Sequence, residues 1–342
     1  MTGPLGAKSV ISEDELVRAI RKLLSGEAPG VAVGIGDDAA VVDAGRHHAI
    51  LTTDMLVEGV HFERASASAH DIGHKALTVN VSDVAAMGGS PRFGLVSIGI
   101  PPDVETPWVI ELYSGIREAA GEYGMAVIGG DTNRAGKVVL SVTVVGAVAR
   151  DHAVTRSGAR PGDHLVVTGS LGAAAGGLRL AQADPHEVRE ALVSDWGRRL
   201  VQAHLRPVAR VGEGETLASA GATAMIDISD GLALDLSRVC AESGVGAAVT
   251  LADVPVAEGL EDLAKAFQGN LDPLDLALHG GEDYELLAAM PPEAVDGAAE
   301  KLAERFGTGL SVVGSITGEQ LRAIGEDGTE RPLEPKGWDH FA

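Results

Sequence analysis

Apolar residues recur along the chain with two different periods, and these predict strands and helices in turn. Runs rich in β-branched residues, typical of strands, occupy residues 47–53, 92–100, 125–130 and 137–148. Apolar residues at helical spacing occupy residues 70–88 and 107–124. The first part of the chain is therefore predicted to combine a mixed sheet with helices.

A polar stretch near residue 150, ARDHAVTRSGARPGD, interrupts this pattern. The elements predicted after it are a strand at 163–169, a glycine-rich turn at 169–177, helices from about 171 to 220, and strands at 222–230 and 283–290. The 342 residues also exceed a single typical core. We therefore expect two domains, residues 1–150 and 151–342.

The start of the chain and its one cysteine add smaller expectations. Ser12 and Glu15 form a capping-box pattern before ELVRAIRKLL, which predicts an N-terminal helix. The segment SGEAPG, residues 25–30, is expected to be flexible. Cys240 is the single cysteine and lies among helix-forming residues, so it is expected to be a buried spectator rather than part of a disulfide or a thiolate cluster.

The net charge and the apolar pattern of the chain bear on which binding partners to expect. The formal net charge is −22, from 27 basic and 49 acidic residues, whereas nucleic-acid binders concentrate Lys and Arg on one face. The opening MTGPLGAKSV lacks the apolar core of a signal peptide, and no apolar run is long enough to span a bilayer. We expect a cytoplasmic protein that binds neither nucleic acid nor membranes.

Acidic residues recur where the predicted strands and helices stop, which is where α/β proteins assemble their sites. These residues are Asp37 and Asp38 after GIG, Asp54 at the end of the strand AILTTD, Asp83 late in a predicted helix, Asp131 after the strand AVIGG, and Asp227 and Asp230 around the end of AMIDISD. Aspartate is also a common turn former and N-cap, and we assign Asp38, Asp163 and Asp235 to that role.

Gathered carboxylates repel one another unless cations bind between them. Oxygen ligands with the hydroxyl neighbours Thr52, Thr53 and Ser229 suit Mg²⁺ rather than zinc, and the eleven histidines show no zinc-binding spacing. Magnesium held by few carboxylates usually shares its other positions with water and substrate phosphates. Phosphoryl transfer is therefore the leading reaction class.

The common nucleotide-binding motifs are missing. GGDTNRAGKV has the wrong spacing for a Walker A loop, and Val138 stands where Ser or Thr is required. GSLGAAAGG does not have the GxGxxG spacing, and its glycines either present amides to a phosphate or allow close helix packing. No HRD-type catalytic loop is present. An ATP user of another architecture is indicated.

Seven motifs in order resemble one family. They are GIGDDAAVV, LTTDMLVEGVHF, KALTVNVSDVAAMGGSP, GGDTNRAG, AVTRSGARPGD, IDISDGLALDL and HGGEDYELL. Together they resemble the thiamine-monophosphate kinases, of the superfamily that includes aminoimidazole ribonucleotide synthetase, from about residue 12 to 338. The resemblance implies ATP-dependent phosphorylation of thiamine monophosphate to thiamine diphosphate. Because the acceptor phosphate is already an anionic nucleophile near neutral pH, we expect direct in-line transfer. The resemblance further implies an α/β (α+β) homodimer whose N-terminal domains pair into a barrel-like sheet.

The resemblance also implies roles for individual residues. Ligands to several Mg²⁺ ions are expected at Asp37, Thr52, Thr53, Asp54, Asp83, Asp131, Asp227 and Asp230. Contacts to ATP are expected at Tyr113, Gly130, Asp131, Arg156 and Ser229. The thiamine portion is expected to contact His61, Glu282 and Trp338.

Several of these residues can also be explained by a purely structural role. Tyr113 is equally well explained as a helix residue packed on the sheet, and Trp338 as an anchor for the chain end. His61 and Glu282 can be structural caps, and Arg156 a surface charge in a loop. For the whole chain, the alternatives are another ATP-dependent enzyme of the superfamily or a non-catalytic nucleotide-binding module. Selenophosphate synthetase and the hydrogenase-maturation protein typically have a reactive Cys or selenocysteine near one terminus, which is absent here.

Overall fold

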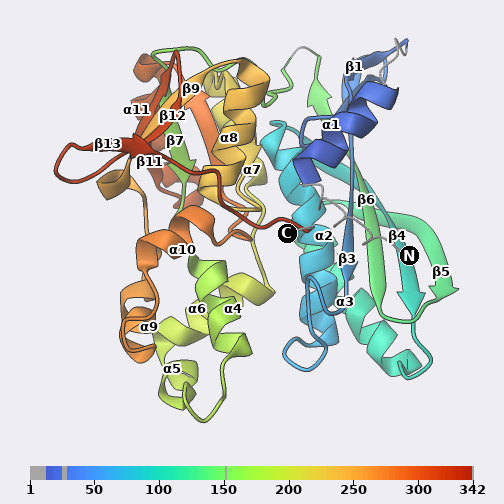
Figure 1. Ribbon diagram of the computed structural model, residues 1–342. Helices are drawn as coiled ribbons and strands as arrows, with labels where there is room; N and C mark the ends of the chain where they lie inside the picture. Colours follow the sequence, from blue (N-terminus) through green and yellow to red (C-terminus); the bar gives the residue numbers. More distant parts are fainter. Residues whose placement is uncertain (1–12, 25–28, 151, 341–342) are drawn as a thin grey trace, which may run out of the picture.

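The computed structural model describes residues 13–24, 29–150 and 152–340, which form two mixed sheets with their helices (Figure 1). The predicted N-terminal helix is present as α1 (Glu13–Leu24), and ion pairs to α8 hold it: Arg21 to Glu242 at 2.6 Å, and Asp14 to Arg238 at 3.4 Å. The capping residue Ser12 and residues 25–28 of the predicted flexible segment lie outside the described residues. No helix in the described part is both long and apolar enough to cross a bilayer.

The first sheet has the strand order β1-β2-β3-β6-β4-β5. Its strands are β1 (Val31–Val33), β2 (Ala40–Asp43), β3 (His47–Val57), β4 (Ser90–Ile100), β5 (Ala126–Arg134) and β6 (Val139–Ala149). The chain crosses from β4 to β5 through helix α3 (Thr106–Glu122), so these two strands pair in parallel, while the other pairs are antiparallel. Helices α2 (Ala69–Ala86) and α3 pack together on one face of this sheet.

The other face of the first sheet exposes large apolar side chains. Met55, Phe93, Leu95 and Ile128 are between 42% and 63% exposed. Strand alternation explains the two faces, because neighbouring residues of a strand point to opposite sides. An uncovered apolar face of this kind marks an interaction surface.

The second sheet has the order β13-β12-β9-β11-β7-β10-β8, with β12 and β9 parallel and the other pairs antiparallel. Its strands are β7 (His164–Thr168), β8 (Ala224–Asp227), β9 (Gly246–Thr250), β10 (Leu286–Met290), β11 (Leu310–Thr317), β12 (Leu321–Ile324) and β13 (Glu330–Pro332). Strands β7, β8 and β10 are buried on both faces, since α8 (Leu232–Ser243) packs on one side and α7 (Val211–Ala220) with α11 (Pro292–Phe306) on the other. Cys240 lies buried and free in α8, as predicted.

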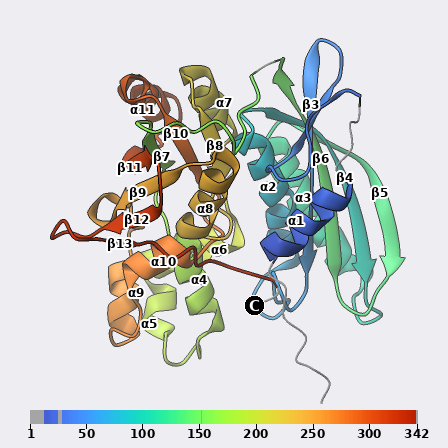
Figure 2. The same cartoon turned by 45° about the horizontal axis from the view of Figure 1, so that its top comes forward.

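A smaller group of helices packs below the second sheet (Figure 2). Its members are α4 (Ala173–Gln182), α5 (Arg189–Val193), α6 (Asp195–Leu205), α9 (Leu260–Ala266) and α10 (Pro273–His279). A 3-10 turn, η1 (Leu251–Asp253), follows β9. Alpha-helical segments predicted between residues 171 and 220 are therefore confirmed, although they serve two different cores.

Helix α2 lies between the two halves of the molecule. It contacts β3 and β6 of the first sheet on one side, and α7 and β8 of the second half on the other. A Cβ at Gly214 of α7 would lie 2.2 Å from the Ala85 carbonyl oxygen, so the glycine permits this close crossing. Fifteen residues of α2 are buried, including Lys75, Asn80 and Ser82. Buried polar groups need partners, and Ser82 of α2 contacts Asp227 while Lys75 contacts Glu282.

Candidate active site

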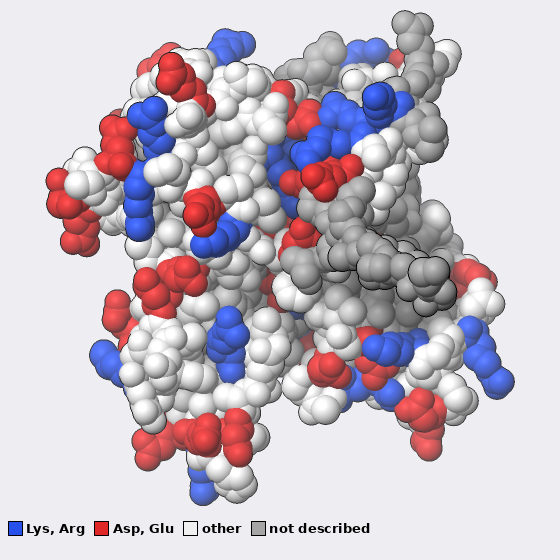
Figure 3. All heavy atoms as spheres, viewed as in Figure 1, with Lys and Arg blue, Asp and Glu red and all other residues white. Residues whose placement is uncertain are grey.

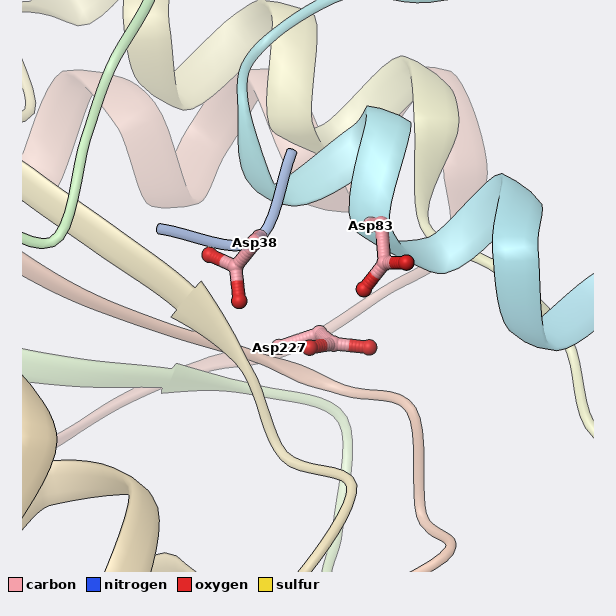
Figure 4. Close-up of side chains that lie close together, drawn as sticks. All are labelled: Asp38, Asp83 and Asp227. Atoms are coloured by element: carbon pink, nitrogen blue, oxygen red, sulfur yellow. The ribbon is translucent and has the colours of Figure 1, made fainter. Parts of the chain in front are cut away.

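Three carboxylates meet at the end of α2 (Figure 4). Asp38 comes from the loop between β1 and β2, Asp83 from the last turn of α2, and Asp227 from the end of β8. One oxygen of each lies within 4.8 Å of the others. The sequence led us to expect Asp83 and Asp227 near one another, but it assigned Asp38 to its local turn, and the structure corrects that assignment.

Burial and mutual repulsion make this cluster costly to ionise. Burial raises the pKa of Asp83 well above its usual range, and the charges of Asp54 and Asp227 raise it further. Burial, followed by the charge of Asp38, has the same effect on the pKa of Asp227. Burial and Asp38 also raise the pKa of Asp37 to about 7. Cations bound among these groups would remove the repulsion.

Arg156 connects both aspartates of the GIGDD turn to the second half of the chain. Its backbone N–H donates to the Asp37 carboxylate at 3.1 and 3.2 Å, and its guanidinium donates to Asp38 Oδ1 at 2.6 and 3.1 Å. The other oxygen, Asp38 Oδ2, is buried and has no hydrogen-bond partner among the described residues. A buried, unpaired carboxylate oxygen beside two further carboxylates fits a hard divalent cation such as Mg²⁺.

Strand β3 places its two threonines on opposite faces of the sheet. The Thr52 hydroxyl donates to Asp83 Oδ2 at 2.5 Å, so Thr52 belongs to the acid cluster. The Thr53 hydroxyl instead donates to the Val142 carbonyl oxygen at 3.1 Å and accepts from Thr143, away from the cluster. The Thr53 hydroxyl therefore points away from the cluster, because adjacent strand residues face opposite ways, and the metal-ligand role of Thr53 stays a prediction.

Asp54 lies within β3, which runs on to Val57, so the expectation that it ends the strand was wrong. Its side chain is close enough to Asp83 to raise the pKa of that carboxyl. The backbone N–H of Asp54 donates to Asn80 Oδ1 at 2.9 Å, which ties the strand to α2 at this point.

The turn after β8 holds Ser229 and Asp230. The carboxylate of Asp235 accepts the backbone N–H groups of Ser229, Asp230 and Gly231 at 3.0 to 3.1 Å, which confirms its predicted role as a turn former. Asp163 likewise accepts the Arg160 N–H in its own turn. Asp230 pairs with Arg238 Nη1 at 2.6 Å. Among the described residues, Asp230 thus borders the three-carboxylate group without joining it.

Gly130, Asp131 and Tyr113 lie elsewhere in the first half. Strand β5 runs through Asp131 to Arg134, so this residue lies within the strand and not after it. Its carboxylate is exposed and accepts from the Asn133 amide at 2.6 Å. A Cβ at Gly130 would lie 1.8 Å from the Val96 carbonyl oxygen, which gives this glycine a packing role. Tyr113 is half-buried on α3 against the core of the first half. Within one chain, the structure does not bring these residues to the acids.

The three residues predicted to hold thiamine gather at a second place, around a pocket that His61, Lys75 and His204 line together. His61 Nδ1 accepts the Val57 N–H at 3.0 Å. Glu282 lies 2.6 Å from Lys75 Nζ and 2.9 Å from His204 Nδ1. Burial alone would raise the pKa of Glu282, but Lys75 and His204 lower it to about 2.

Trp338 reaches the same region through the C-terminal tail. Its backbone N–H donates to the Asp230 carbonyl oxygen at 3.0 Å, and its indole N–H donates to His340 Nδ1 at 3.1 Å. The His340 ring lies 5.0 Å from the His61 ring, centroid to centroid. The Trp338 side chain itself is 49% exposed. The tail is thus anchored by the backbone, and the indole stays accessible.

The glycine-rich turn before α4 has its own partner. The N–H groups of Gly172 and Ala174 donate to Asp283 at 2.7 and 3.3 Å. A Cβ at Gly172 would lie 2.9 Å from the Ala277 backbone nitrogen, so close packing requires this glycine. Of the two roles left open for GSLGAAAGG, the structure favours the packing role, because a carboxylate of the chain takes these amides.

Sequence reasoning missed several polar residues at both places. Ser82 donates to Asp227 Oδ2 at 2.5 Å, and Asn80 holds the backbone of Asp54. Lys75 and His204 flank Glu282. The available signal was in KALTVNVSD, where polar residues fall on every side of a helix that is otherwise apolar, and such a helix must be buried.

Two family models match the chain: AIR synthase related protein, N-terminal domain, over residues 36–148, and AIR synthase related protein, C-terminal domain, over residues 160–325. The thiamine-monophosphate kinase of Aquifex aeolicus is 35% identical over 331 residues, covering 97% of this chain and 98% of that protein. The thiamine-monophosphate kinase of Escherichia coli K12 is 37% identical over 315 residues, covering 91% and 93%.

A solved structure of AaThiL complexed with AMPPCP and TMP superposes with a TM-score of 0.84 at 34% identity, covering 99% of this chain and 100% of that chain. The similarity therefore extends over both sheets and both charged places described above. At this identity over nearly its whole length, the chain belongs to the thiamine-monophosphate kinase family of AIR synthase-related proteins.

Proposed function

We propose that this chain transfers the γ-phosphoryl group of ATP directly and in line to thiamine monophosphate, forming thiamine diphosphate. The main support is the meeting of Asp38, Asp83 and Asp227 in a group where Arg156 pairs with Asp38 alone. Asp83 lies on the same helix as Lys75, which lines the pocket together with His61. The relative solved with AMPPCP and TMP holds an ATP analogue and the acceptor together.

We propose that Mg²⁺ ions bind at this group, with ligands from Asp37, Asp38, Asp54, Asp83, Asp227 and Asp230 and the hydroxyl of Thr52. When bound, Mg²⁺ neutralises the approaching phosphates and holds them in line. Arg156 keeps Asp38 in place, and Ser82 and Thr52 orient the carboxylates of Asp227 and Asp83 by hydrogen bonds.

No general base is needed at the acceptor. The second pKa of a phosphate monoester is about 6, so thiamine monophosphate is already a dianionic nucleophile near neutral pH. The protein therefore has to position two negatively charged groups, and the reaction proceeds without a phosphoenzyme intermediate. Protein that retains 32P after denaturation, following incubation with γ-labelled ATP, would contradict direct transfer.

The acceptor is the part of the proposal most open to test. We would measure thiamine diphosphate by chromatography after incubating the purified chain with ATP, MgCl₂ and thiamine monophosphate, with unphosphorylated thiamine in a parallel reaction. Product from the monophosphate alone, abolished by EDTA, is expected. Magnesium-dependent ATP binding without product would contradict this acceptor and favour another enzyme of the superfamily or a non-catalytic module.

We also propose a homodimer formed by the exposed apolar face of the first sheet, where Met55, Phe93, Leu95 and Ile128 lie. Strands β6 and β4 separate β3 from β5, so Asp131 and Asp54 of one chain are about 14 Å apart. We propose that Asp131, Gly130 and Tyr113 contact the ATP bound at the acids of the second subunit rather than of their own.

Subunit mixing tests this arrangement. Asp83→Asn and Asp131→Asn are each expected to be inactive, and refolding them together forms heterodimers with one intact site. Activity of about a quarter of the wild-type value in the mixture supports the dimer, because half of the dimers then have half of their sites intact. An inactive mixture, or a monomer by light scattering, contradicts it.

Two further expectations stay proposals. We place the domain boundary near residue 150, between the last strand of the first sheet and the first strand of the second. We also propose a cytoplasmic enzyme, where ATP is available, with no nucleic-acid or membrane partner. The face shown in Figure 3 supports the last point, since acidic and basic side chains are interspersed over much of it.

A further inference from the structure

Two side chains that were not among the predicted substrate-binding residues, Lys75 and His204, contact Glu282. Lys75 Nζ of α2 lies 2.6 Å from one carboxylate oxygen, and His204 Nδ1 of α6 lies 2.9 Å from the other. Lys75 and His204 are only 4% and 7% exposed. Because each side chain contacts a different oxygen, the two together fix the orientation of the carboxylate.

The contact with Glu282 does not use all the hydrogen-bonding capacity of Lys75 and His204. Lys75 Nζ and His204 Nδ1 are buried, and among the described residues neither makes a hydrogen bond of good geometry. An ammonium group has three donors, and a buried lysine is costly unless a charge or a ligand compensates it. Both side chains line the same pocket as His61, so their remaining donors are next to the place where a ligand would bind.

The backbone around Glu282 is held in an unusual conformation. Glu282 and Tyr284 have φ values of 60° and 52°, in the left-handed region that is unfavourable for residues other than glycine. Their N–H groups donate to the Ser229 and Ile228 carbonyl oxygens at 2.7 and 2.9 Å. Asp283, between them, accepts from the start of α4. Strain held by several contacts at once is characteristic of functional sites.

Helix α2 links this pocket to the acid cluster. Lys75 and Asp83 are eight residues apart on it, which corresponds to about 12 Å along the axis. A ligand with a ring system at one end and a phosphate at the other can therefore contact both places. The position of Lys75 on the helix sets the distance between them.

We propose that Lys75 and His204 are positioning residues, which hold Glu282 ionised and in one orientation toward the ring-bearing end of thiamine monophosphate. The inference rests on the proposed function, since it takes the acceptor from there. It adds a role for two residues that do not themselves belong to the phosphoryl-transfer machinery.

The test compares Lys75→Met, Lys75→Arg and Glu282→Gln with the wild type. We would measure the Kd of thiamine monophosphate by calorimetry with Mg²⁺ and AMPPCP present, and the KM for both substrates. Lys75→Met is expected to weaken thiamine monophosphate binding about 10- to 100-fold, the usual cost of losing a charge-assisted contact. The KM for ATP should change by less than about 2-fold, and Lys75→Arg should restore part of the affinity.

A double variant guards against misfolding, because Lys75→Met alone leaves a buried carboxylate without its cation. Lys75→Met/Glu282→Gln removes both charges and should bind thiamine monophosphate as Glu282→Gln does, if Lys75 acts through Glu282. Lys265→Met, at an exposed lysine paired with Asp262, is the matched control and should leave the Kd unchanged.

Three results would overturn the inference: an unchanged Kd in folded Lys75→Met, an equal loss of ATP affinity, or a double variant much weaker than Glu282→Gln. Failure of the proposed function looks different. In that case the wild type would bind thiamine monophosphate without forming product, and the Kd comparison would still decide the role of Lys75. A wild type that does not bind thiamine monophosphate overturns both.

Discussion

Helix α2 contributes to a buried charged cluster near its C-terminal end and to another nearer its start, and the two are balanced in opposite ways. At the end, Asp83 meets Asp38 and Asp227, and burial and repulsion raise the pKa of Asp83 and Asp227 well above the usual range. Nearer the start, Lys75 and His204 overcome the effect of burial and lower the pKa of Glu282 to about 2.

The difference indicates whether each cluster requires cations from solution. In the Glu282 cluster, Lys75 and His204 of the chain itself contact both carboxylate oxygens, so the protein alone fixes its geometry. The acid cluster has Arg156 on only one of its carboxylates, and Asp38 Oδ2 is left without a partner among the described residues. Under the proposed function, bound cations complete its geometry, and the metal-free protein tolerates the repulsion at a cost in stability.

Among the variants considered, Asp83→Asn should have the largest effect, because it changes turnover and stability in opposite directions. Removing one carboxylate from the shared group should lower turnover by about 1000-fold or more, as expected when metal-assisted charge neutralisation is lost. The same change should raise the melting temperature of the metal-free protein, because it relieves repulsion. Steady-state kinetics and thermal unfolding in EDTA measure the two effects.

Asp235→Asn is the control at a structural aspartate, because Asp235 is fully buried and its carboxylate accepts three backbone N–H groups and pairs with Arg238. This variant should lose about 1–3 kcal/mol of unfolding free energy. If Asp83→Asn lost stability to the same extent, the acid at Asp83 would be structural.

Magnesium should stabilise the wild type and not Asp83→Asn. A ligand that binds only the folded state adds about 2.7 kcal/mol to the unfolding free energy at 100 times its Kd. Thermal unfolding with and without MgCl₂, each also with EDTA, measures the shift. Glu282→Gln should respond to Mg²⁺ as the wild type does, and loss of the response in that variant would contradict the independence of the two clusters.

The contribution of the Glu282 cluster to the unfolding free energy should depend on pH and not on Mg²⁺. The pKa of Glu282 is lowered from 4.5 to about 2 in the folded state, so ionisation of this group favours folding above pH 4.5. That contribution, about 3 kcal/mol, should be lost as the pH falls from 4.5 toward 2. Urea unfolding of wild type and Glu282→Gln at pH 6.5 and pH 3.5 measures it. A difference between the two proteins that does not shrink at low pH would contradict the pairing with Lys75.

The sequence predicted much of the acid cluster because a carboxylate at the end of a strand is a local signal. It wrongly placed Asp54 and Asp131 at strand ends, since β3 and β5 continue past the points where the β-branched runs stop. Pairing with neighbouring strands sets those lengths, and pairing is not local. The same limit explains Thr53, whose face depends on the register of β3 against β6.

The Glu282 cluster was only partly predictable. The GGED motif drew attention to Glu282, but Lys75 and His204 come from helices 207 and 78 residues away along the chain. A lysine in a helix is ordinarily a solvated residue, and only the burial of α2 on every side changes that expectation. The mixed strands and helices of both halves were predictable, whereas the packing that buries α2 between them was not.

Trp338→Ala should give the smallest effect and decides between its two roles. The backbone N–H of Trp338 bonds to the Asp230 carbonyl oxygen whatever side chain is present, so the tail stays anchored and the melting temperature should change little. Losing an exposed ring that faces a cationic substrate costs about 0.5–1 kcal/mol, which is a 2- to 5-fold rise in the KM for thiamine monophosphate. Trp338→Phe keeps a ring and should fall between the two. A lower melting temperature with an unchanged KM would instead identify the indole as an anchor, and the Glu282 pocket would then bind its ligand without help from the tail.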